Sequence, residues 1–507
     1  MRGWEFTLAV DRAHPLPVFL QIAKAIADDV RRGRLKPGDR LPGTRTLART
    51  LQVHRNTVIA AYEELAAEGW TTAFRARATF IARALPDPRP RKFASAIAIR
   101  DVIPGRVTYD LRPTPPAFVP VSGETARSAL PLAADGPDVR LFPASAMARA
   151  YRRSLRQQTR TVLGHAPAEG HPRLRAALAD MLTATRAVAA GPDSVMVTRG
   201  SQMALALAAF ALFDTGHLVV VEDLGVRAAW EAFRLAGARV VAVPVDREGL
   251  RIDSLRELAR REPIRAVYVT PHHQYPTTVT LSPRRRIELL ELAREARFAI
   301  IEDDYDHEFC YEGRPVLPLA SVDRCGCVVY VGTFSTVLAP GLRIGYVVAP
   351  VPLLEQMSTY RAFLDAQGDH AVEAAVAELL EDGELRRHLQ RARRIYVSRR
   401  DLLIETLRAE LGGVLTCDVP SGGTGIWAHV DPTIDVDLWA ARGPDHGVVF
   451  HAARRFAFDG RSRPYVRLGF CSLDETELRD AVRRMARALP SRRERTYPCC
   501  QPNQMCS

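Results

Sequence analysis

Apolar side chains near the start of the chain recur three to four residues apart in three short stretches. This spacing predicts amphipathic helices at 15–30, 44–51 and 54–68, because such residues share one face of a helix. Gln52-Val53 predicts a tight turn between the second and third helices. The apolar positions are Phe19, Ile22, Ala23, Ile26 and Val30, then Leu47 and Leu51, then Val58, Tyr62 and Leu65. Three short helices with a tight turn before the last are typical of a helix-turn-helix.

Beyond the first 120 residues, helical stretches alternate with short apolar ones. Alternation of this kind predicts a mostly parallel sheet in an α/β domain. The predicted strands are 194–198, 217–222, 239–243, 266–270, 298–302, 327–332 and 343–349. A smaller α+β lobe is expected to close the chain from about Pro350.

The fold class is therefore multidomain. Residues 12–82 are predicted to form a helix-turn-helix domain, and 121–490 the α/β domain with its small lobe. The stretch 83–120 is rich in proline and arginine, which predicts a semi-rigid linker. Residues 491–507 are interpreted as a disordered tail.

Charge is concentrated at the front of the chain. The net charge is +12, and residues 1–92 hold 17 Lys and Arg against 9 Asp and Glu, which predicts a polyanionic partner. The second helix of a helix-turn-helix offers its first residues to the DNA major groove. The residues expected to face bases are Arg55, Asn56 and Thr57, and those expected to contact phosphates are Lys36, Arg45 and Arg49. A solvated basic helix face is the alternative for any single arginine.

Membrane and metal binding are not predicted. No apolar run approaches the roughly 20 residues needed to span a bilayer, and the N-terminus lacks the pattern of a signal peptide, so a cytoplasmic protein is expected. The eight cysteines are expected to be reduced. Cys325-Gly-Cys327 is too closely spaced for an ordinary metal clip, and no metal ligands are assigned.

The run from Leu41 to Val58 reads Leu-Pro-x-x-Arg-x-Leu-Ala-x-x-Leu-x-Val-x-Arg-x-Thr-Val. It is similar to the winged helix-turn-helix of GntR-type bacterial regulators, over about residues 16–82. The resemblance implies binding to double-stranded promoter DNA. The expected wing, 70–81, lacks the glycines usual at its tip, which makes a tight turn there less favourable.

The segment from Val331 to Tyr346 resembles the one that carries the cofactor lysine in fold-type-I pyridoxal-phosphate (PLP) proteins of the aspartate aminotransferase superfamily. The lysine position holds Thr336, whose hydroxyl cannot form an imine with the aldehyde, so no catalytic residue is assigned and no internal aldimine is expected. No lysine lies beyond Lys92.

The same resemblance implies the other residues of the cofactor site. Asp303 would bind the pyridinium nitrogen, Tyr305 the phenolic oxygen, and Arg343 the phosphate. Arg467 resembles the arginine that binds a substrate or effector carboxylate. The remaining cofactor residues are Gly200, Ser201 and Gln202, at a predicted helix N-terminus, and Thr333 and Ser335.

Together the two segments resemble MocR-type regulators, in which a GntR-like domain is joined to an aminotransferase-like domain. This implies a homodimeric transcriptional regulator whose large domain senses PLP, a related vitamer, or an amine or amino-acid effector, with the cofactor bound non-covalently if at all. Two alternatives remain: an aminotransferase fused to a DNA-binding domain, and a dimeric DNA-binding scaffold that needs no ligand.

Overall fold

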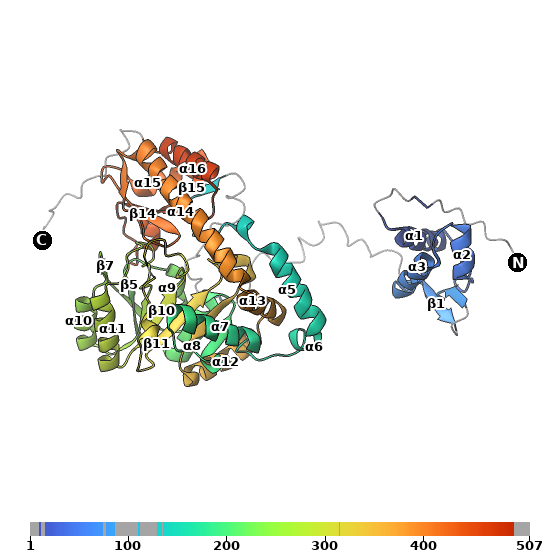
Figure 1. The fold of residues 1–507 in the computed structure, drawn as a ribbon, viewed down its shortest axis with the longest axis horizontal. Helices are drawn as coiled ribbons and strands as arrows, with labels where there is room; N and C mark the ends of the chain where they lie inside the picture. Colours follow the sequence, from blue (N-terminus) through green and yellow to red (C-terminus); the bar gives the residue numbers. More distant parts are fainter. Residues whose placement is uncertain are drawn as a thin grey trace. The chain divides into compact units, whose positions relative to one another are not determined.

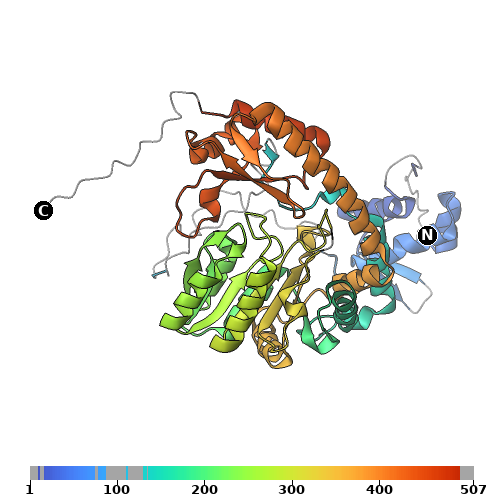
Figure 2. The ribbon, with the colours of Figure 1, turned by 60° about the vertical axis from the view of Figure 1, so that its left-hand side comes forward.

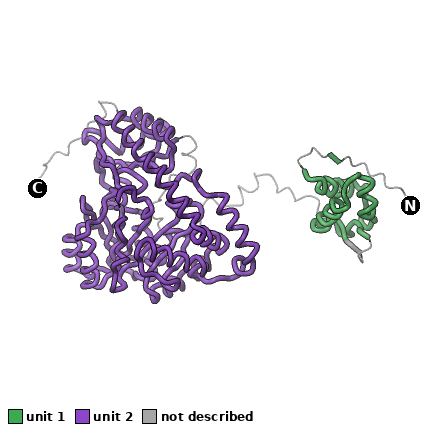
Figure 3. Tube along the Cα trace, in the orientation of Figure 1, with its two compact units in different colours: residues 1–113 green, residues 114–507 purple. Residues whose placement is uncertain are grey.

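The computed structural model describes residues 10–11, 16–74, 78–86, 110–111, 129–133, 135–313 and 315–490. The chain divides into two compact units, residues 1–113 and 114–507 (Figure 3). Most of the expected linker 83–120 and all of the expected tail 491–507 lie outside the described residues.

The first unit is a three-helix domain with a two-stranded hairpin (Figure 1). Its elements are α1 (Val18–Arg31), α2 (Thr44–Thr50), α3 (Arg55–Ala67), β1 (Thr71–Phe74) and β2 (Ala78–Ile81). The apolar faces predicted from spacing meet in one core, which includes Ile22, Leu47, Val58 and Leu65. Gln52 adopts a left-handed φ of 54° in the turn between α2 and α3. The three predicted helices are confirmed.

The predicted wing is the hairpin of β1 and β2. Its strands pair antiparallel, with Thr71 opposite Ile81 and Phe74 opposite Ala78. Its tip, residues 75–77, lies outside the described residues, so the expected effect of the missing glycines on the turn stays a prediction.

The second unit contains a seven-stranded sheet in the order β4-β12-β11-β10-β9-β5-β6. All neighbours pair in parallel except β12, which runs antiparallel to both β11 and β4. The strands are β4 (Val195–Thr198), β5 (Leu218–Glu222), β6 (Arg239–Val243), β9 (Ile264–Val269), β10 (Ala299–Asp304), β11 (Val328–Thr333) and β12 (Gly345–Val348). The predicted mostly parallel sheet and its strands are confirmed.

Helices cover both faces of this sheet (Figure 2). The helices are α5 (Ala144–Gln157), α6 (Thr159–Val162), α7 (Pro172–Arg186), α8 (Ser201–Leu212), α9 (Arg227–Leu235), α10 (Ile252–Arg261), α11 (Pro283–Ala296), α12 (Val351–Leu364) and α13 (His370–Glu381). Ile301 lies in the core shared with α8 and α9, whereas its neighbour Ile300 lies in the core shared with α10 and α11. A short hairpin, β7 (Val245–Asp246) and β8 (Gly249–Leu250), follows β6. The alternation along β10 assigns successive side chains to opposite faces of the sheet.

The C-terminal lobe is a four-stranded antiparallel sheet with three helices, drawn in orange and red in Figure 2. Its strand order is β13-β14-β17-β16. The elements are α14 (Glu384–Leu411), β13 (Leu415–Cys417), β14 (Gly425–Val430), α15 (Val436–Arg442), β16 (His451–Ala452), β17 (Tyr465–Gly469) and α16 (Glu475–Arg487). A separate parallel pair joins β3 (Leu130–Pro131) to β15 (Val448–Val449).

The lobe begins later than its expected start at Pro350. Helix α12 packs against α8, and α13 packs against α5 and α7, so both belong to the domain of the seven-stranded sheet. The small buried residues of α13, including Ala374 and Ala375, allow this close packing of helices. Among the described residues, no helix has the length and apolar character that crossing a membrane requires.

Candidate cofactor pocket and DNA-contacting helix

Asp303 lies at the carboxyl end of β10, where ligands of open α/β sheets collect. It is 5 % exposed, and one oxygen, Oδ2, accepts a hydrogen bond of 2.8 Å from the Tyr268 hydroxyl. The other oxygen, Oδ1, is buried without a partner. Burial raises the pKa of the Asp303 carboxyl to about 7, and the Tyr268 hydrogen bond opposes this shift. An unpartnered buried carboxylate oxygen fits a cationic N–H donor, such as the protonated ring nitrogen of a pyridoxal-type cofactor.

Thr336 and Tyr305 are directly connected. The Thr336 hydroxyl donates a hydrogen bond to the backbone carbonyl of Tyr305. The Tyr305 hydroxyl donates to the backbone carbonyl of His273 at 3.0 Å. The Thr336 hydrogen bond thereby joins the segment after β11 to the segment after β10. The Tyr305 hydroxyl would have to break its hydrogen bond to the His273 carbonyl before it could donate to a ligand oxygen.

Gly200, Ser201 and Arg343 come together at the N-terminus of α8. Gly200 has φ of 76°, and a side-chain carbon placed there would lie 3.1 Å from the Arg343 guanidinium nitrogens. Arg343 donates to the Arg199 carbonyl at 2.7 Å. A cavity of about 210 Å³ beside them is lined by Thr198, Arg199, Gly341, Leu342, Arg343, Ile344, Asp369, Val372 and Glu373. A helix N-terminus and a guanidinium at one place form a site that suits a phosphate.

The other expected cofactor residues are arranged less uniformly. Gln202 is exposed, and its amide donates to the Ala228 carbonyl at 2.9 Å. Thr333 is buried at the end of β11, where its hydroxyl accepts the Ser335 N–H at 3.0 Å. Gln202 therefore contacts the start of α9, and Thr333 shapes the turn that leads to Thr336.

Arg467 is 1 % exposed and is held by the chain itself. Its Nε donates to Asp135 Oδ1 at 2.9 Å, and its Nη1 donates to the Pro276 carbonyl at 2.7 Å. The guanidinium carbon lies 4.5 Å from the centre of the Tyr275 ring, and the Tyr275 hydroxyl donates to the second Asp135 oxygen at 2.9 Å. Only Nη2 has no partner. Asp135 thus occupies the face of Arg467 that a ligand carboxylate would use, and no sequence motif marks it.

A second buried carboxylate lies at the end of β5. Glu222 is 2 % exposed, and it accepts hydrogen bonds from the Thr270 hydroxyl at 2.9 Å and the Thr270 N–H at 3.2 Å. Burial raises the pKa of Glu222 to about 8, and the hydrogen bonds from Thr270 only partly oppose this shift. Glu222 therefore binds a proton in the folded protein near neutral pH.

The residues expected to meet DNA are on the surface of the first unit. Arg55 and Asn56 are exposed at the N-terminus of α3, and Thr57 is half-buried behind them. Lys36, Arg45 and Arg49 are also exposed. The His54 side chain caps α3 by accepting the Asn56 N–H at 3.3 Å, a role that the sequence analysis did not assign. Arg55 Nε donates a long hydrogen bond of 3.4 Å to the Thr44 hydroxyl, and the first turn of α3 is exposed, as a recognition helix requires.

Two families match this chain. Residues 134–485 match the aminotransferase class I and II family, and residues 19–81 match the gntR family of bacterial regulatory proteins. The first match alone spans more than half of the chain.

Two bacterial regulatory proteins are similar to this chain over most of its length and over most of their own. The chain is 32 % identical over 479 residues to the Rhizobium meliloti protein named Probable rhizopine catabolism regulatory protein MocR, covering 94 % of each. It is 30 % identical over 462 residues to the HTH-type pyridoxine biosynthesis transcriptional regulator PdxR of Corynebacterium glutamicum, covering 88 % of this chain and 94 % of that protein.

Two solved aminotransferase structures are similar to most of this chain. A multiple substrate aminotransferase from Thermococcus profundus superimposes with a TM-score of 0.67 at 30 % identity, over 71 % of this chain and 91 % of that one. The alpha-aminoadipate aminotransferase LysN of Thermus thermophilus, complexed with N-(5'-phosphopyridoxyl)-L-leucine, gives 0.67 at 30 % identity, over 73 % and 95 %.

Proposed function

The chain belongs to the MocR-type regulators, which join a GntR-family helix-turn-helix to a class I and II aminotransferase domain, and we propose that its large domain senses a ligand without covalent cofactor chemistry. The observation that carries this proposal is Thr336, which stands at the position that the sequence resemblance gives to the cofactor lysine. Its hydroxyl is engaged with the Tyr305 carbonyl, and the described part of the large unit contains no lysine.

The proposed ligand is PLP or a related vitamer. Two separate features support this class: the unpartnered oxygen of Asp303, which suits a ring N–H, and the helix N-terminus with Arg343, which suits a phosphate. When bound, the cofactor supplies an electron sink for amine substrates. The chain's own residues bind and orient the ligand, and none of the assigned residues replaces the lysine amine as a nucleophile or proton carrier.

The proposed output is a change in how the helix-turn-helix domain occupies promoter DNA. Arg55, Asn56 and Thr57 read bases, and Lys36, Arg45 and Arg49 hold the backbone. A homodimer would present two such helices to two half-sites. The proposed effector is an amine or an amino acid, and the carboxylate of an amino acid would bind Arg467 at its unpartnered Nη2 or by displacing Asp135.

The primary test is equilibrium binding of PLP and of pyridoxamine phosphate to the full-length protein by calorimetry. We expect both to bind, and borohydride reduction followed by mass spectrometry to detect no covalent adduct. A Thr336→Lys variant is expected to gain a PLP adduct under the same treatment. Binding of neither ligand to either protein would contradict the sensor and favour the dimeric scaffold that needs no ligand.

Arg343→Ala provides a sharper test of the phosphate assignment. Loss of one charge-assisted hydrogen bond should weaken PLP binding by about 1.5–3 kcal/mol. Arg297→Ala is a matched control, because Arg297 is exposed at the end of α11 with φ of 57°, close to the 54° of Arg343. Equal losses in the two variants would show an effect that is not specific to the pocket and would reject the phosphate contact.

An aminotransferase remains the competing activity. Amino-donor turnover above that of free PLP, abolished by Arg343→Ala, would overturn the proposal in favour of that enzyme. DNA binding that changes with PLP in the absence of turnover supports the sensor.

A further inference from the structure

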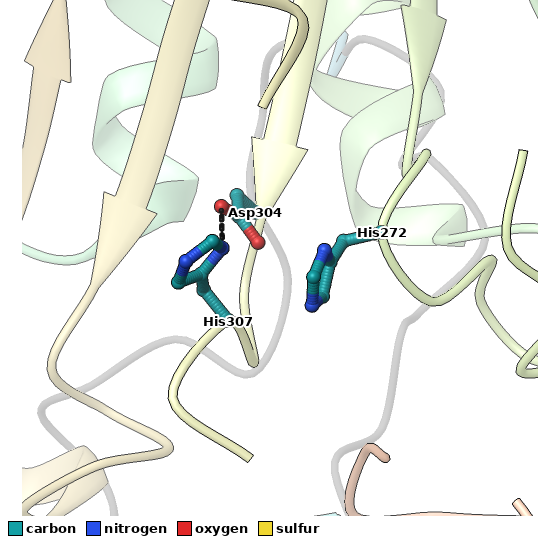
Figure 4. Close-up of side chains that lie close together, drawn as sticks. All are labelled: His272, Asp304 and His307. Carbon is teal, nitrogen blue, oxygen red and sulfur yellow. Dashed lines mark ion pairs between the residues drawn. The ribbon is translucent and has the colours of Figure 1, made fainter. Parts of the chain in front are cut away.

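Two histidines and an aspartate converge between the ends of β9 and β10 (Figure 4). His272 follows β9, Asp304 ends β10, and His307 follows three residues later. Each can offer one ligand atom such that the three atoms lie within 4.8 Å of one another. The imidazole rings of His272 and His307 are 4.7 Å apart between centres. The expectation of no metal site rested on cysteine spacing, which contains no information on this cluster.

The polar atoms of this cluster are buried and mostly without partners. His272, Asp304 and His307 are 5 %, 3 % and 5 % exposed. Both ring nitrogens of His272 and Asp304 Oδ1 lack a hydrogen-bond partner. Nδ1 of His307 lies 3.0 Å from Asp304 Oδ2 without the geometry of a hydrogen bond. Buried imidazole nitrogens are costly when they bind nothing, and these atoms are available to coordinate a cation.

The cluster is separate from the cofactor pocket. Successive strand residues face opposite sides of a sheet, and Asp303 bonds Tyr268 on one side while Asp304 bonds Tyr330 on the other. Tyr268 packs in the core with α8 and α9, and Tyr330 packs in the core with α7 and α13.

The surrounding charges permit a cation. The Tyr330 hydroxyl donates to Asp304 Oδ2 at 2.6 Å, which orients the carboxylate as partners outside the coordination shell do at metal sites. Arg186 is the nearest positive charge, with Nη1 3.7 Å from Asp304 Oδ2, but its other nitrogen pairs with Glu308. Asp304 and Glu308 together outweigh that single positive charge.

The cluster also has a route to the surface. A cavity of about 630 Å³ between α7 and α14 is lined by His307, Glu308 and Arg186 among others. An ion can therefore approach His307 without unfolding of the sheet, and the cavity leaves room for water as a further ligand.

We propose that His272, Asp304 and His307 bind one divalent transition-metal ion. Zn²⁺ is the ion used to test this proposal. Two imidazoles and a carboxylate suit such ions, whereas Mg²⁺ and Ca²⁺ prefer oxygen ligands alone. The ion ties the segment after β9 to the segment after β10. These segments carry His273 and Tyr305, which are already joined by a hydrogen bond of 3.0 Å.

The test uses full-length protein without a histidine tag, stripped with a chelator and titrated with Zn²⁺ in a calorimeter. We expect one tightly bound Zn²⁺ per chain, and at least a tenfold loss of affinity in His272→Gln and in His307→Gln. His446→Gln is the matched control, since His446 lies in the C-terminal lobe, and it should bind like the parent. Unchanged affinity in His272→Gln, or no binding to the parent, overturns the proposal.

Cysteine ligation is the main competing source of binding, because Cys499, Cys500 and Cys506 lie close together in the sequence. Co²⁺ distinguishes the two, since thiolate ligands add an intense charge-transfer band that imidazoles and carboxylates lack. We expect visible bands of tetrahedral or five-coordinate Co²⁺ without the thiolate band, unchanged when the three cysteines are replaced by serine. A thiolate band that disappears in that triple variant overturns the proposal. The Co²⁺ spectrum of the parent protein distinguishes histidine from cysteine ligation even if a histidine variant fails to fold.

Discussion

Arg467 is a buried guanidinium whose charge is already balanced inside the chain. Burial acts to lower the pKa of Arg467, but the adjacent Asp135 carboxylate outweighs it, so the pKa is raised and the group stays charged. A ligand carboxylate must displace Asp135 or bind only to Nη2, the one guanidinium nitrogen without a partner. Asp135 thus makes the Arg467 guanidinium less accessible to the carboxylate of an amino acid.

Asp135→Asn is expected to open Arg467 to such ligands. The amide keeps a hydrogen-bond partner for Tyr275 but removes the competing charge, so amino acids should bind about 10-fold to 100-fold more tightly, the equivalent of one charged hydrogen bond. Calorimetric titration with a panel of amino acids measures this. Asp193→Asn, at an exposed aspartate, should change nothing. If Asp135→Asn also binds no amino acid better, Arg467 is a structural residue.

Glu222 predicts a pH dependence of stability. Its folded pKa of about 8 is raised from the usual 4.5, so the folded state binds the proton more tightly than the unfolded one. This stabilisation is fully present below about pH 4.5 and is lost as pH rises to about 8. Glu222→Gln mimics the protonated acid and should remove this pH-dependent component, which is on the order of 5 kcal/mol. Denaturant unfolding of both proteins across this range measures it, and parallel pH profiles would contradict it.

Helix α3 has an exposed first turn and a buried face that packs in the core of the first unit. His54 caps its N-terminus, and the first turn presents Arg55 and Asn56 to solvent while Val58 and Leu65 anchor the opposite face in the core. Because the anchored face fixes the helix rotation, the exposed first turn has one orientation toward a DNA groove.

Arg55→Ala should weaken operator binding and relax selectivity at one base pair, by about 1–3 kcal/mol. Arg49→Ala, on α2, should instead weaken binding to all sequences and reduce the salt dependence by about one counterion. Binding titrations against an operator and its single-base variants at several salt concentrations separate the two. A loss for Arg55→Ala that is equal on every sequence would make Arg55 a phosphate contact.

The carboxyl end of strand β10 supplies one residue to each of the two candidate sites. Its last two residues, Asp303 and Asp304, point to opposite faces, one toward the candidate cofactor pocket and one toward the candidate metal site. A ligand at either place therefore contacts the same strand end, together with Tyr305 and its hydrogen bond to His273.

At the scale of the whole molecule, two units with separate cores share one chain. The small unit needs only its three helices and hairpin to bury Ile22, Val58 and Leu65. The large unit combines a seven-stranded sheet with a lobe to which the early segment β3 also contributes. The match to the gntR family falls within the first unit, and the match to the aminotransferase class I and II family falls within the second.

Much of the fold could be predicted because it depends on local patterns. Helical spacing located α1, α2 and α3, and apolar runs located each strand of the main sheet. The start of the lobe was misplaced, because Pro350 ends a strand region without showing which core the next helix joins. Only the packing of α12 on α8 assigns it to the sheet domain.

The sequence by itself determined the two-domain layout and the family, because these depend on residue order and on residue identity. The assignment of Thr336 to the lysine position stays a prediction from the resemblance. The tertiary structure alone decided that Asp135 meets Arg467, that His272 meets Asp304 and His307, and that Gln202 turns to Ala228. These partners lie on different elements, and their contacts depend on how the strand ends and the lobe pack together, which no local pattern along the chain encodes.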